Sequence, residues 1–386
     1  MKANLNLLIM ENDYIIVGCG LYGITAARLL TNRGFKCLII DKRNHIGGTC
    51  YSQKIGMVDI HKYGPHIFHT SNEKVINFVN RYSKFNTFQL NILADYGRKY
   101  YHLPFNMNTF LEFFDVRIPS AAKAVIDMEI KSSGIDPMNP KNLAEKAISL
   151  VGTTIYKELI KEYTEKQWGR PCDELPAWII NRLPLRFSFD NNYFNDTFQG
   201  VPSFGYDTLF RNIIKGNVGE KEIEVVLNGD FLQDKGKWLN SSTHVIYCGS
   251  VDELFDYRLG TLEWRSLEFK EIEYQFDGYN GQACPIVNKT FAEERATRFI
   301  DHIYFNQQAV NNYRGTTVLT KEYPCKWEKG KERYYPINND KNNTLYGEYL
   351  KLIKKEYPQI SMGGRVGLYR YMDMDDTILE AMKNYG

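Results

Sequence analysis

The stretch Tyr14-Ile-Ile-Val-Gly-Cys-Gly-Leu-Tyr-Gly23 decides the fold class of this chain of 386 residues. It joins an apolar run to a G-x-G-x-x-G turn, and a helix-like segment, residues 24–33, follows directly. In a dinucleotide-binding βαβ unit, Gly18 permits the tight turn, Gly20 lets the backbone approach a pyrophosphate, and Gly23 allows close packing of helix and strand. The pyrophosphate then lies at the positive N-terminal end of the helix. We therefore predict an α/β protein with a Rossmann-like dinucleotide-binding domain.

The residues that follow this unit indicate which dinucleotide it binds. Residues 36–40 form the predicted second strand, and Asp41 after it is placed to accept a hydrogen bond from a ribose hydroxyl. Arg43 and the glycine pair Gly47 and Gly48 come next. This addition favours FAD over NAD, because FAD enzymes of the glutathione-reductase type commonly carry such a segment. A glycine-rich turn without a nucleotide is the alternative, and the complete βαβ setting disfavours it.

The composition limits the partners and the compartment. The 48 basic and 46 acidic residues nearly cancel, which disfavours nucleic acid or an anionic membrane as a bulk partner. No apolar run reaches the roughly 18 residues of a membrane span, and residues 1–10 are too short and polar for a signal segment. We therefore expect a cytoplasmic protein. The seven cysteines show no C-x-x-C pair or histidine at metal-ligand spacing, so we expect reduced thiols and no metal site.

The middle of the chain has a helical pattern. Residues 109–166 are predicted to be helical, and Asn142 with Glu145 forms a capping-box start for one helix that ends at Gly152. A second helix carries apolar residues at helical spacing from 155 to 163. This region is predicted to be an inserted helical domain.

The second half of the chain is mostly extended. Residues 222–227 and 244–250 are predicted to be further strands of the nucleotide domain, and residues 261–320 alternate as antiparallel strands do. Near the end, Asp373 is a suitable N-cap for a helix over 377–384. The N-terminus of that helix, together with Arg365, would stabilise negative charge on the pyrimidine ring of a reduced flavin.

The predicted architecture thus has three parts: an FAD-binding Rossmann-like domain, an inserted helical domain and an antiparallel-sheet substrate domain. The predicted boundaries are 12–84, 201–254 and 330–386 for the FAD-binding domain, 85–155 for the helical domain, and 156–200 with 255–325 for the substrate domain.

Several long strings are more specific than the glycine motif. They include Lys42-Arg-Asn-His-Ile-Gly-Gly48, His61-Lys-Tyr-Gly-Pro-His-Ile-Phe-His-Thr70, Tyr163-Thr-Glu-Lys-Gln-Trp-Gly-Arg170, Phe255-Asp-Tyr-Arg-Leu-Gly-Thr-Leu-Glu263 and Tyr334-Tyr-Pro-Ile-Asn338. On these strings the chain resembles, over almost its whole length, the flavin-dependent UDP-galactopyranose mutases and their nucleotide-sugar mutase relatives.

The resemblance implies an isomerase, specifically an intramolecular transferase, that interconverts a nucleotide-linked pyranose and furanose. The furanose product, such as galactofuranose, would serve surface polysaccharide or capsule synthesis. It also implies FAD that is active when reduced by NAD(P)H or another reductant, with N5 of the reduced flavin attacking the anomeric carbon. The implied partner is a nucleotide sugar, UDP-linked in the family, and a homodimer is a further expectation that the resemblance brings.

The resemblance also assigns site residues. It implies that Arg182 and Arg298 hold the departing diphosphate, since arginine forks suit phosphate geometry, and that His66 lies beside the flavin. The implied substrate-binding residues are Tyr163, Thr164, Trp168, Arg182, Tyr193, Asn288, Arg298, Tyr335 and Tyr371. The implied cofactor-binding residues are Gly18, Gly20, Tyr22, Gly23, Asp41, Lys42, Gly48, Thr49, His66, Ile67, Val225, Arg365, Met372, Asp373, Met374 and Thr377.

The chain departs from the family pattern where a substrate would lie. Leu90 replaces a usual asparagine, Ala296 a usual tyrosine, and Arg333 a usual proline. A polar group lost from a sugar site alters discrimination by about 1–3 kcal/mol. The sugar therefore stays open between galactose, arabinopyranose, N-acetylgalactosamine, a deoxysugar and a heptose, carried on UDP or another nucleotide.

Two other classes share the opening βαβ unit. One is a redox flavoenzyme of the amine-oxidase type, which would consume NADH in step with product. The other is a binding module without flavin, as in inhibitors of nucleotide release from small GTPases. The paired arginines and the tyrosine cluster favour the mutase over both.

Overall fold

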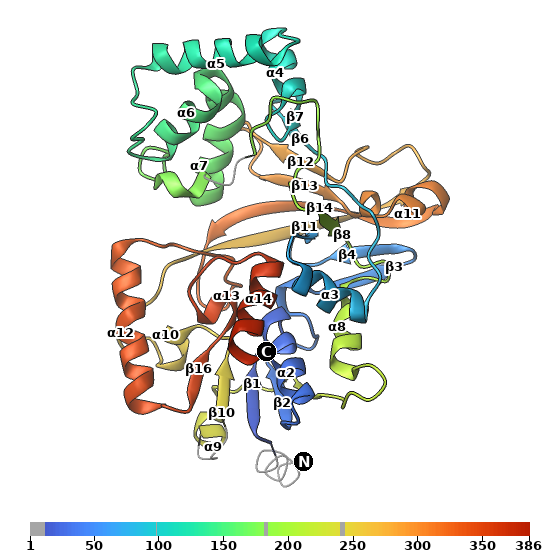
Figure 1. Ribbon diagram of the computed structural model, residues 1–386, viewed down its shortest axis with the longest axis vertical. Coiled ribbons are helices and arrows are strands. Elements are labelled where there is room, and N and C mark those ends of the chain that lie inside the picture. Colours follow the sequence, from blue (N-terminus) through green and yellow to red (C-terminus); the bar gives the residue numbers. More distant parts are fainter. Residues whose placement is uncertain (1–11, 98, 181–183, 240–243) are drawn as a thin grey trace.

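The computed structural model describes residues 12–97, 99–180, 184–239 and 244–386 (Figure 1). A parallel sheet with helices lies at one end of the molecule, a second large sheet crosses its middle, and a group of helices lies at the other end (Figure 1). The predicted fold class, a Rossmann-like domain combined with a helical part and a largely antiparallel sheet, is confirmed. Within the described ranges, no helix has the length and apolar character to cross a bilayer.

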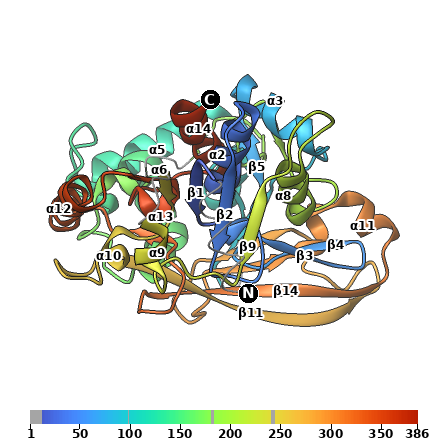
Figure 2. The ribbon, with the colours of Figure 1, turned by 90° about the horizontal axis from the view of Figure 1, so that it is seen from below.

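The nucleotide-binding part is built on a five-stranded sheet in which every pairing is parallel. Its strands, in sheet order, are β16 (Ile360–Met362), β10 (His244–Tyr247), β1 (Tyr14–Val17), β2 (Cys37–Asp41) and β9 (Glu224–Leu227). Ile15 and Ile16 of β1 point to opposite faces and are both fully buried, as expected for a parallel sheet covered on both sides. Helices α2 (Leu21–Asn32) and α14 (Met374–Tyr385) pack together on one face (Figure 2).

The glycine turn after β1 has the geometry that the motif predicts. Gly18 has φ +111°, in the region that favours glycine. A Cβ atom on Gly23 would overlap the carbonyl oxygen of Gly18, so only glycine allows α2 to pack this closely behind the turn. α14 begins at Met374, three residues before the predicted start at Thr377, with Asp373 at the predicted N-cap.

The second sheet has seven strands, and the antiparallel pair of β11 and β14 forms its longest pairing (Figure 2). Its strands, in sheet order, are β15 (Tyr335–Pro336), β11 (Trp264–Phe276), β14 (Gly315–Lys326), β13 (Arg298–Asp301), β12 (Ile286–Lys289), β6 (Ile92–Asp95) and β7 (Tyr100–Leu103). All neighbours are antiparallel except β6 and β12.

Two predicted domain boundaries differ from this arrangement. Residues 92–103 belong to the seven-stranded sheet and not to a helical domain over 85–155, because β6 hydrogen-bonds with the distant strand β12. The sequence predicts that the sheet domain starts at 156. Residues 156–168 are instead helical and pack with α6. Local sequence patterns do not reveal either long-range pairing.

The helical part contains α4 (Met107–Phe114), α5 (Pro119–Ser133), α6 (Leu143–Ile155), the π-helical turn η2 (Tyr156–Lys161) and α7 (Glu162–Trp168). Asn142 caps α6 by accepting from the backbone N–H of Glu145, as predicted. The backbone leaves the helical conformation at Gly152, with φ 80° and ψ 173°, where the helix was expected to end. Helical structure resumes after this kink and continues through η2, whose wider turn re-aims α7 toward the seven-stranded sheet.

The remaining elements connect these parts. They are η1 (Gly48–Cys50), β3 (Ser52–Ile55), β4 (Val58–His61), β5 (Phe68–Thr70), α3 (Glu73–Tyr82), η3 (Ala177–Ile180), β8 (Phe198–Gly200), α8 (Tyr206–Lys215), α9 (Lys235–Leu239), α10 (Val251–Leu254), η4 (His302–Phe305), α11 (Gln307–Asn312), α12 (Asp340–Glu356) and α13 (Gly364–Gly367).

Candidate active site

Two adjoining cavities lie where the three parts of the molecule meet. The first has a volume of about 410 Å³ and is lined by the glycine turn, the 63–67 segment and α14. The second has a volume of about 480 Å³ and lies between the helical part and the seven-stranded sheet. Six residues line both cavities, so the two form one continuous site: Tyr163, Tyr193, Asn288, Arg298, Tyr335 and Tyr371.

The glycine turn forms one end of the first cavity and suits a pyrophosphate. Gly20 is the N-cap of α2 and has no side chain to cap the first N–H groups of the helix. Gly48 faces it so closely that a Cβ on Gly48 would lie 3.0 Å from the Gly20 Cα. Both glycines line the cavity. Free helix N–H groups and a bare backbone on both sides fit a dinucleotide phosphate.

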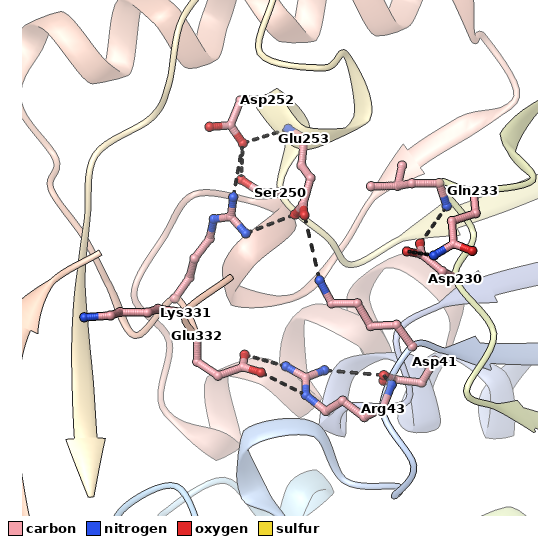
Figure 3. Close-up of polar contacts among 12 residues, drawn as sticks. Asp41, Arg43, Asp230, Gln233, Ser250, Asp252, Glu253, Lys331 and Glu332 are labelled. Carbon is pink, nitrogen blue, oxygen red and sulfur yellow. Dashed lines mark hydrogen bonds and ion pairs between the residues drawn. The ribbon is translucent and has the colours of Figure 1, made fainter. Parts of the chain in front are cut away.

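Asp41 lies beside this turn, but both of its oxygens already accept hydrogen bonds. Oδ2 accepts from the Cys19 N–H at 2.7 Å, and Oδ1 accepts from the Arg43 N–H at 2.8 Å. Arg43 lies between Asp41 and Glu332, and pairs with both oxygens of Glu332 (Figure 3). Burial opposes the charge of Arg43, but Glu332 and Asp41 outweigh it and raise its pKa. Asp41 therefore organises the turn, and its contact with a ribose stays a prediction.

Most of the predicted cofactor-binding residues line this cavity, and two do not. Lys42 is largely exposed and lies 3.8 Å from Glu253, and Val225 pairs with Ile39 inside the five-stranded sheet. Neither side chain contributes to the lining that the described residues form. The lining includes Gly18, Gly20, Tyr22, Gly23, Asp41, Gly48, Thr49, His66, Ile67, Arg365, Met372, Asp373, Met374 and Thr377.

His66 lines the cavity as a neutral imidazole. Its Nδ1 lies 2.7 Å from the Gly64 carbonyl oxygen, and a carbonyl only accepts, so Nδ1 carries the proton. Burial, with His61 and Arg365 nearby, lowers the pKa of His66 to about 3. The ring is therefore neutral at pH 7, and Nε2 is a hydrogen-bond acceptor. The backbone N–H of His66 donates to His61 Nδ1 at 3.0 Å, which holds the turn in place.

Another wall of the first cavity carries the N-terminus of α14 and Arg365. The N-terminus of α14 begins at Met374, and the Asp373 N–H is held by the Asp376 carboxylate at 3.4 Å. Arg365 lines the same wall and donates to Thr49 Oγ1 at 3.3 Å. Three carboxylates, those of Asp373, Asp375 and Asp376, also lie at this helix start, so its predicted stabilisation of negative charge on a flavin stays a prediction.

Three side chains on neighbouring strands form a polar row across the seven-stranded sheet. Asn288 of β12 lies opposite Arg298 of β13, which lies opposite Glu322 of β14. Residues directly opposite each other share one face of a sheet, and all three line the cavity. Arg298 Nε donates to Glu322 Oε1 at 3.0 Å, and Thr297 Oγ1 donates to the same oxygen at 3.1 Å. The other oxygen, Oε2, is buried without a hydrogen-bond partner among the described residues.

This row provides a permanently charged arginine. Burial opposes the charge of the Arg298 guanidinium, but the adjacent Glu322 carboxylate outweighs it and holds the pKa of Arg298 well above its ordinary value. The Glu322 side chain is 1% exposed and the Arg298 side chain 21% exposed, so the guanidinium still reaches the cavity. Of the two charged groups, Arg298 is therefore the more accessible to an anion in the cavity.

Four tyrosines surround Arg298 at the junction of the cavities: Tyr163, Tyr193, Tyr335 and Tyr371. The Tyr335 and Tyr371 rings stack with centroids 5.9 Å apart, and Trp168 lies 6.3 Å from Tyr335. Burial raises the pKa of all four phenols, so they stay protonated at neutral pH; Tyr371 hydrogen-bonds to Asp373, and the other three can donate hydrogen bonds to a ligand. Phosphate oxygens only accept, which matches this set of donors.

The predicted contacts on α7 line the second cavity. Thr164 and Trp168 belong to its lining, together with the apolar residues Leu159 and Ile160. Arg182, the second predicted arginine, lies outside the described residues, so its place in the site stays a prediction.

The three departures from the family pattern lie in different surroundings. Leu90 is 3% exposed and lines the first cavity beside Ile92 and Ile286. Arg333 lies at the cavity edge, where its guanidinium stacks on Trp327 at 4.1 Å and pairs with Glu253 at 3.0 Å. Ala296 is fully buried and is not part of the lining formed by the described residues.

Sequence reasoning missed Glu322, Glu332 and the lysine of the Tyr163–Arg170 string, and it singled out Arg43 without its ion pair with Glu332. For that lysine, the only sequence signal was its position within the Tyr163–Arg170 string. The two carboxylates gain their importance from arginines that are distant in the chain, and no local pattern marks them.

Comparisons with known proteins agree with this arrangement. A family model described as UDP-galactopyranose mutase matches residues 158–371, and one described as an NAD(P)-binding Rossmann-like domain matches residues 16–82. A probable UDP-galactopyranose mutase of Klebsiella pneumoniae is 37% identical over 376 residues, which are 97% of this chain and 94% of that protein. A dTDP-fucopyranose mutase of Escherichia coli is 36% identical over 379 residues, 96% of this chain and 97% of that protein. A crystal structure of reduced UDP-galactopyranose mutase has the same fold, with a TM-score of 0.70 at 15% identity, and the match covers 97% of this chain and 94% of that one.

Proposed function

The chain belongs to the UDP-galactopyranose mutase family, and on that premise we propose that it is an FAD-dependent isomerase that interconverts the pyranose and furanose forms of a nucleotide-linked sugar. The observation that carries the proposal is the position of Arg298. This arginine and the phenol groups of Tyr163, Tyr193 and Tyr335 lie at the junction of a dinucleotide cradle and a second cavity. Such a site holds a diphosphate while the bond between that diphosphate and the sugar breaks and re-forms.

The cradle fits FAD, whose pyrophosphate would lie against the bare backbone of Gly20 and Gly48 and whose flavin would lie near His66 and Arg365. When bound and reduced, FAD supplies a nucleophile, N5, for the anomeric carbon of the sugar. The protein residues do the remaining work. Arg298, Tyr335 and the other phenols bind the diphosphate, and the neutral His66 Nε2 is free to accept a hydrogen bond.

The residues of α7 would complete the nucleotide end of the site. Thr164 and Trp168 of the second cavity provide a hydroxyl and an aromatic surface for the nucleoside, and Asn288 provides an amide. The Asn288 Oδ1 is buried without a partner among the described residues, as expected of a group that a ligand satisfies.

A second candidate for the substrate is a deoxysugar on dTDP. Leu90, Ile92 and Ile286 give the first cavity an apolar wall where the family pattern has an amide at position 90. An apolar wall favours a methyl group over a hydroxyl, because a buried hydroxyl without a partner is costly. The similarity to a dTDP-fucopyranose mutase, at 36% identity, supports testing this substrate beside UDP-galactose.

The test is an anaerobic assay of the dithionite-reduced holoprotein with UDP-galactose, dTDP-fucopyranose, UDP-arabinopyranose and UDP-N-acetylgalactosamine, with products resolved by chromatography. We expect furanose product from at least one of them and none from the oxidised protein. NADH consumption in step with product would instead indicate a redox flavoenzyme. A colourless protein that cannot be reconstituted with FAD would refute the flavin assignment and favour a binding module.

A further inference from the structure

The ammonium group of Lys166, in α7, is enclosed by main-chain carbonyl groups from another part of the chain. Its Nζ donates to the carbonyl oxygens of Lys289 at 2.8 Å, Phe291 at 3.0 Å, Glu294 at 2.7 Å and Ala296 at 3.1 Å. Three N–H donors thus serve four acceptors: Lys289 is the last residue of β12, and the other three lie in the connection from β12 to β13. We call residues 289–296 with the Lys166 ammonium the carbonyl cage.

The cage joins the two walls of the second cavity. On α7, Lys166 stands between Tyr163 and Trp168, both of which line that cavity. The connection that forms the cage begins after Asn288 and ends before Arg298, which line it from the opposite side. One charged group therefore links both sets of predicted nucleotide-sugar contacts.

α7 has a second attachment to the sheet, but this one does not reach the β12–β13 connection. Arg265 of β11 donates to the Gln167 carbonyl oxygen at 2.9 Å and to the Lys166 carbonyl oxygen at 3.2 Å. These bonds satisfy the last carbonyls of the helix and hold its C-terminal end. Arg265 therefore anchors α7 to β11, whereas the carbonyl cage ties α7 to the segment that joins the strands of Asn288 and Arg298.

We propose that Lys166 is a positioning residue of the nucleotide-sugar site, which holds α7 and the β12–β13 connection at the separation that lets both walls contact one nucleotide. This inference rests on the proposed function. Binding and turnover in such a site depend on placement to within about 1 Å, so loosening the cage should weaken nucleotide binding without touching the flavin cradle. Lys166 itself need not contact the ligand.

The charge of Lys166 is sensitive to its surroundings. Burial lowers the pKa of Lys166 to about 8. The charged groups around it are Glu162 on its own helix, Glu293 and Glu294 in the connection, which favour the ammonium, and Lys289 of β12, which opposes it. Above this pKa the lysine loses its proton and its charge, and the cage should loosen.

The experiment compares Lys166→Met with Lys161→Met in the full-length FAD-loaded protein, with UDP and dTDP as probes in calorimetric titrations. Lys161 is an exposed lysine in the preceding turn, so its replacement removes the same charge without touching the cage. We expect Lys166→Met to bind the nucleotide diphosphate at least tenfold more weakly than the wild type and to show a raised KM. Flavin content and the flavin absorption spectrum should be unchanged, and Lys161→Met should match the wild type.

A nucleotide affinity of Lys166→Met within twofold of the wild type would overturn the proposal. Equal losses of flavin and nucleotide would also overturn it, since that pattern indicates general unfolding. If the variant cannot be purified, the wild type decides: its affinity for the diphosphate should fall at least threefold from pH 7 to pH 9.5, and a constant affinity overturns the proposal. A wild-type protein that retains FAD but binds neither diphosphate would instead refute the proposed function.

Discussion

Replacing Glu322 by glutamine tests whether this buried carboxylate balances the positive charge of Arg298 when no substrate is bound. The two groups meet at 3.0 Å, with the Glu322 side chain almost fully buried. Removing one partner of a buried ion pair costs about 3–5 kcal/mol of folding free energy. Glutamine keeps an oxygen acceptor and Arg298 is 21% exposed, so we expect Glu322→Gln to lower the free energy of unfolding by about 2–3 kcal/mol.

The same change should strengthen nucleotide binding. Without the carboxylate, the positive charge of Arg298 is unpaired in the empty site, and a diphosphate restores a counter-ion. We expect UDP or dTDP to bind the variant about tenfold more tightly, which corresponds to about 1.4 kcal/mol. The ligand should therefore stabilise the variant against urea by more than it stabilises the wild type.

Urea denaturation with and without the diphosphate, together with calorimetric titration, measures both effects. Glu268→Gln is the matched control, because Glu268 pairs with Lys331 at 2.8 Å on the exposed side of β11 and its loss should cost less than about 1 kcal/mol. A Glu322→Gln protein that is as stable as the wild type, or that binds the diphosphate more weakly, would refute the view that Glu322 balances Arg298.

Three further substitutions test the remaining assignments. Arg298→Ala should lower kcat/KM at least about 10²-fold while flavin content stays at the wild-type level, and wild-type turnover would contradict its role. Gly20→Val should reduce the flavin content of the purified protein, because the new side chain would press on the Gly48 backbone and cover the surface that a pyrophosphate would contact; undiminished flavin would place the pyrophosphate elsewhere. Leu90→Asn should shift the ratio of kcat/KM for UDP-galactose over that for dTDP-fucopyranose upward by about tenfold, in line with about 1–3 kcal/mol for one polar contact; an unchanged ratio would mean that position 90 does not select the sugar.

The nucleotide-binding unit was predictable because all of its determinants are local. The glycine turn, the strand before it and the helix after it lie within Tyr14–Asn32, and each glycine has a steric role that the structure confirms for Gly18 and Gly23. Asn142 and Gly152 were predictable for the same reason, since a cap and a kink depend on neighbouring residues. The domain boundaries at 85–155 and 156–200 were less accurate, because pairing of β6 with β12 depends on a distant segment.

The candidate site was also predictable in part. The resemblance to the mutase family predicted Tyr163, Arg298 and Tyr335, and the structure brings these residues to one junction. Lys42 and Val225 belong to equally recognisable segments but do not line the cavity. A motif specifies which residues are present, whereas the direction of each side chain depends on how its strand or loop packs.

By itself, the sequence determined the βαβ unit, the family and most of the residues that surround the cavities, because short strings of residues carry that information. Only the tertiary structure decided which charges compensate one another. Glu322 meets Arg298 through the pairing of β13 with β14, and Lys166 meets the 289–296 connection across more than a hundred residues of chain. Such contacts arise when distant segments pair and exclude water, so no local pattern of residues encodes them.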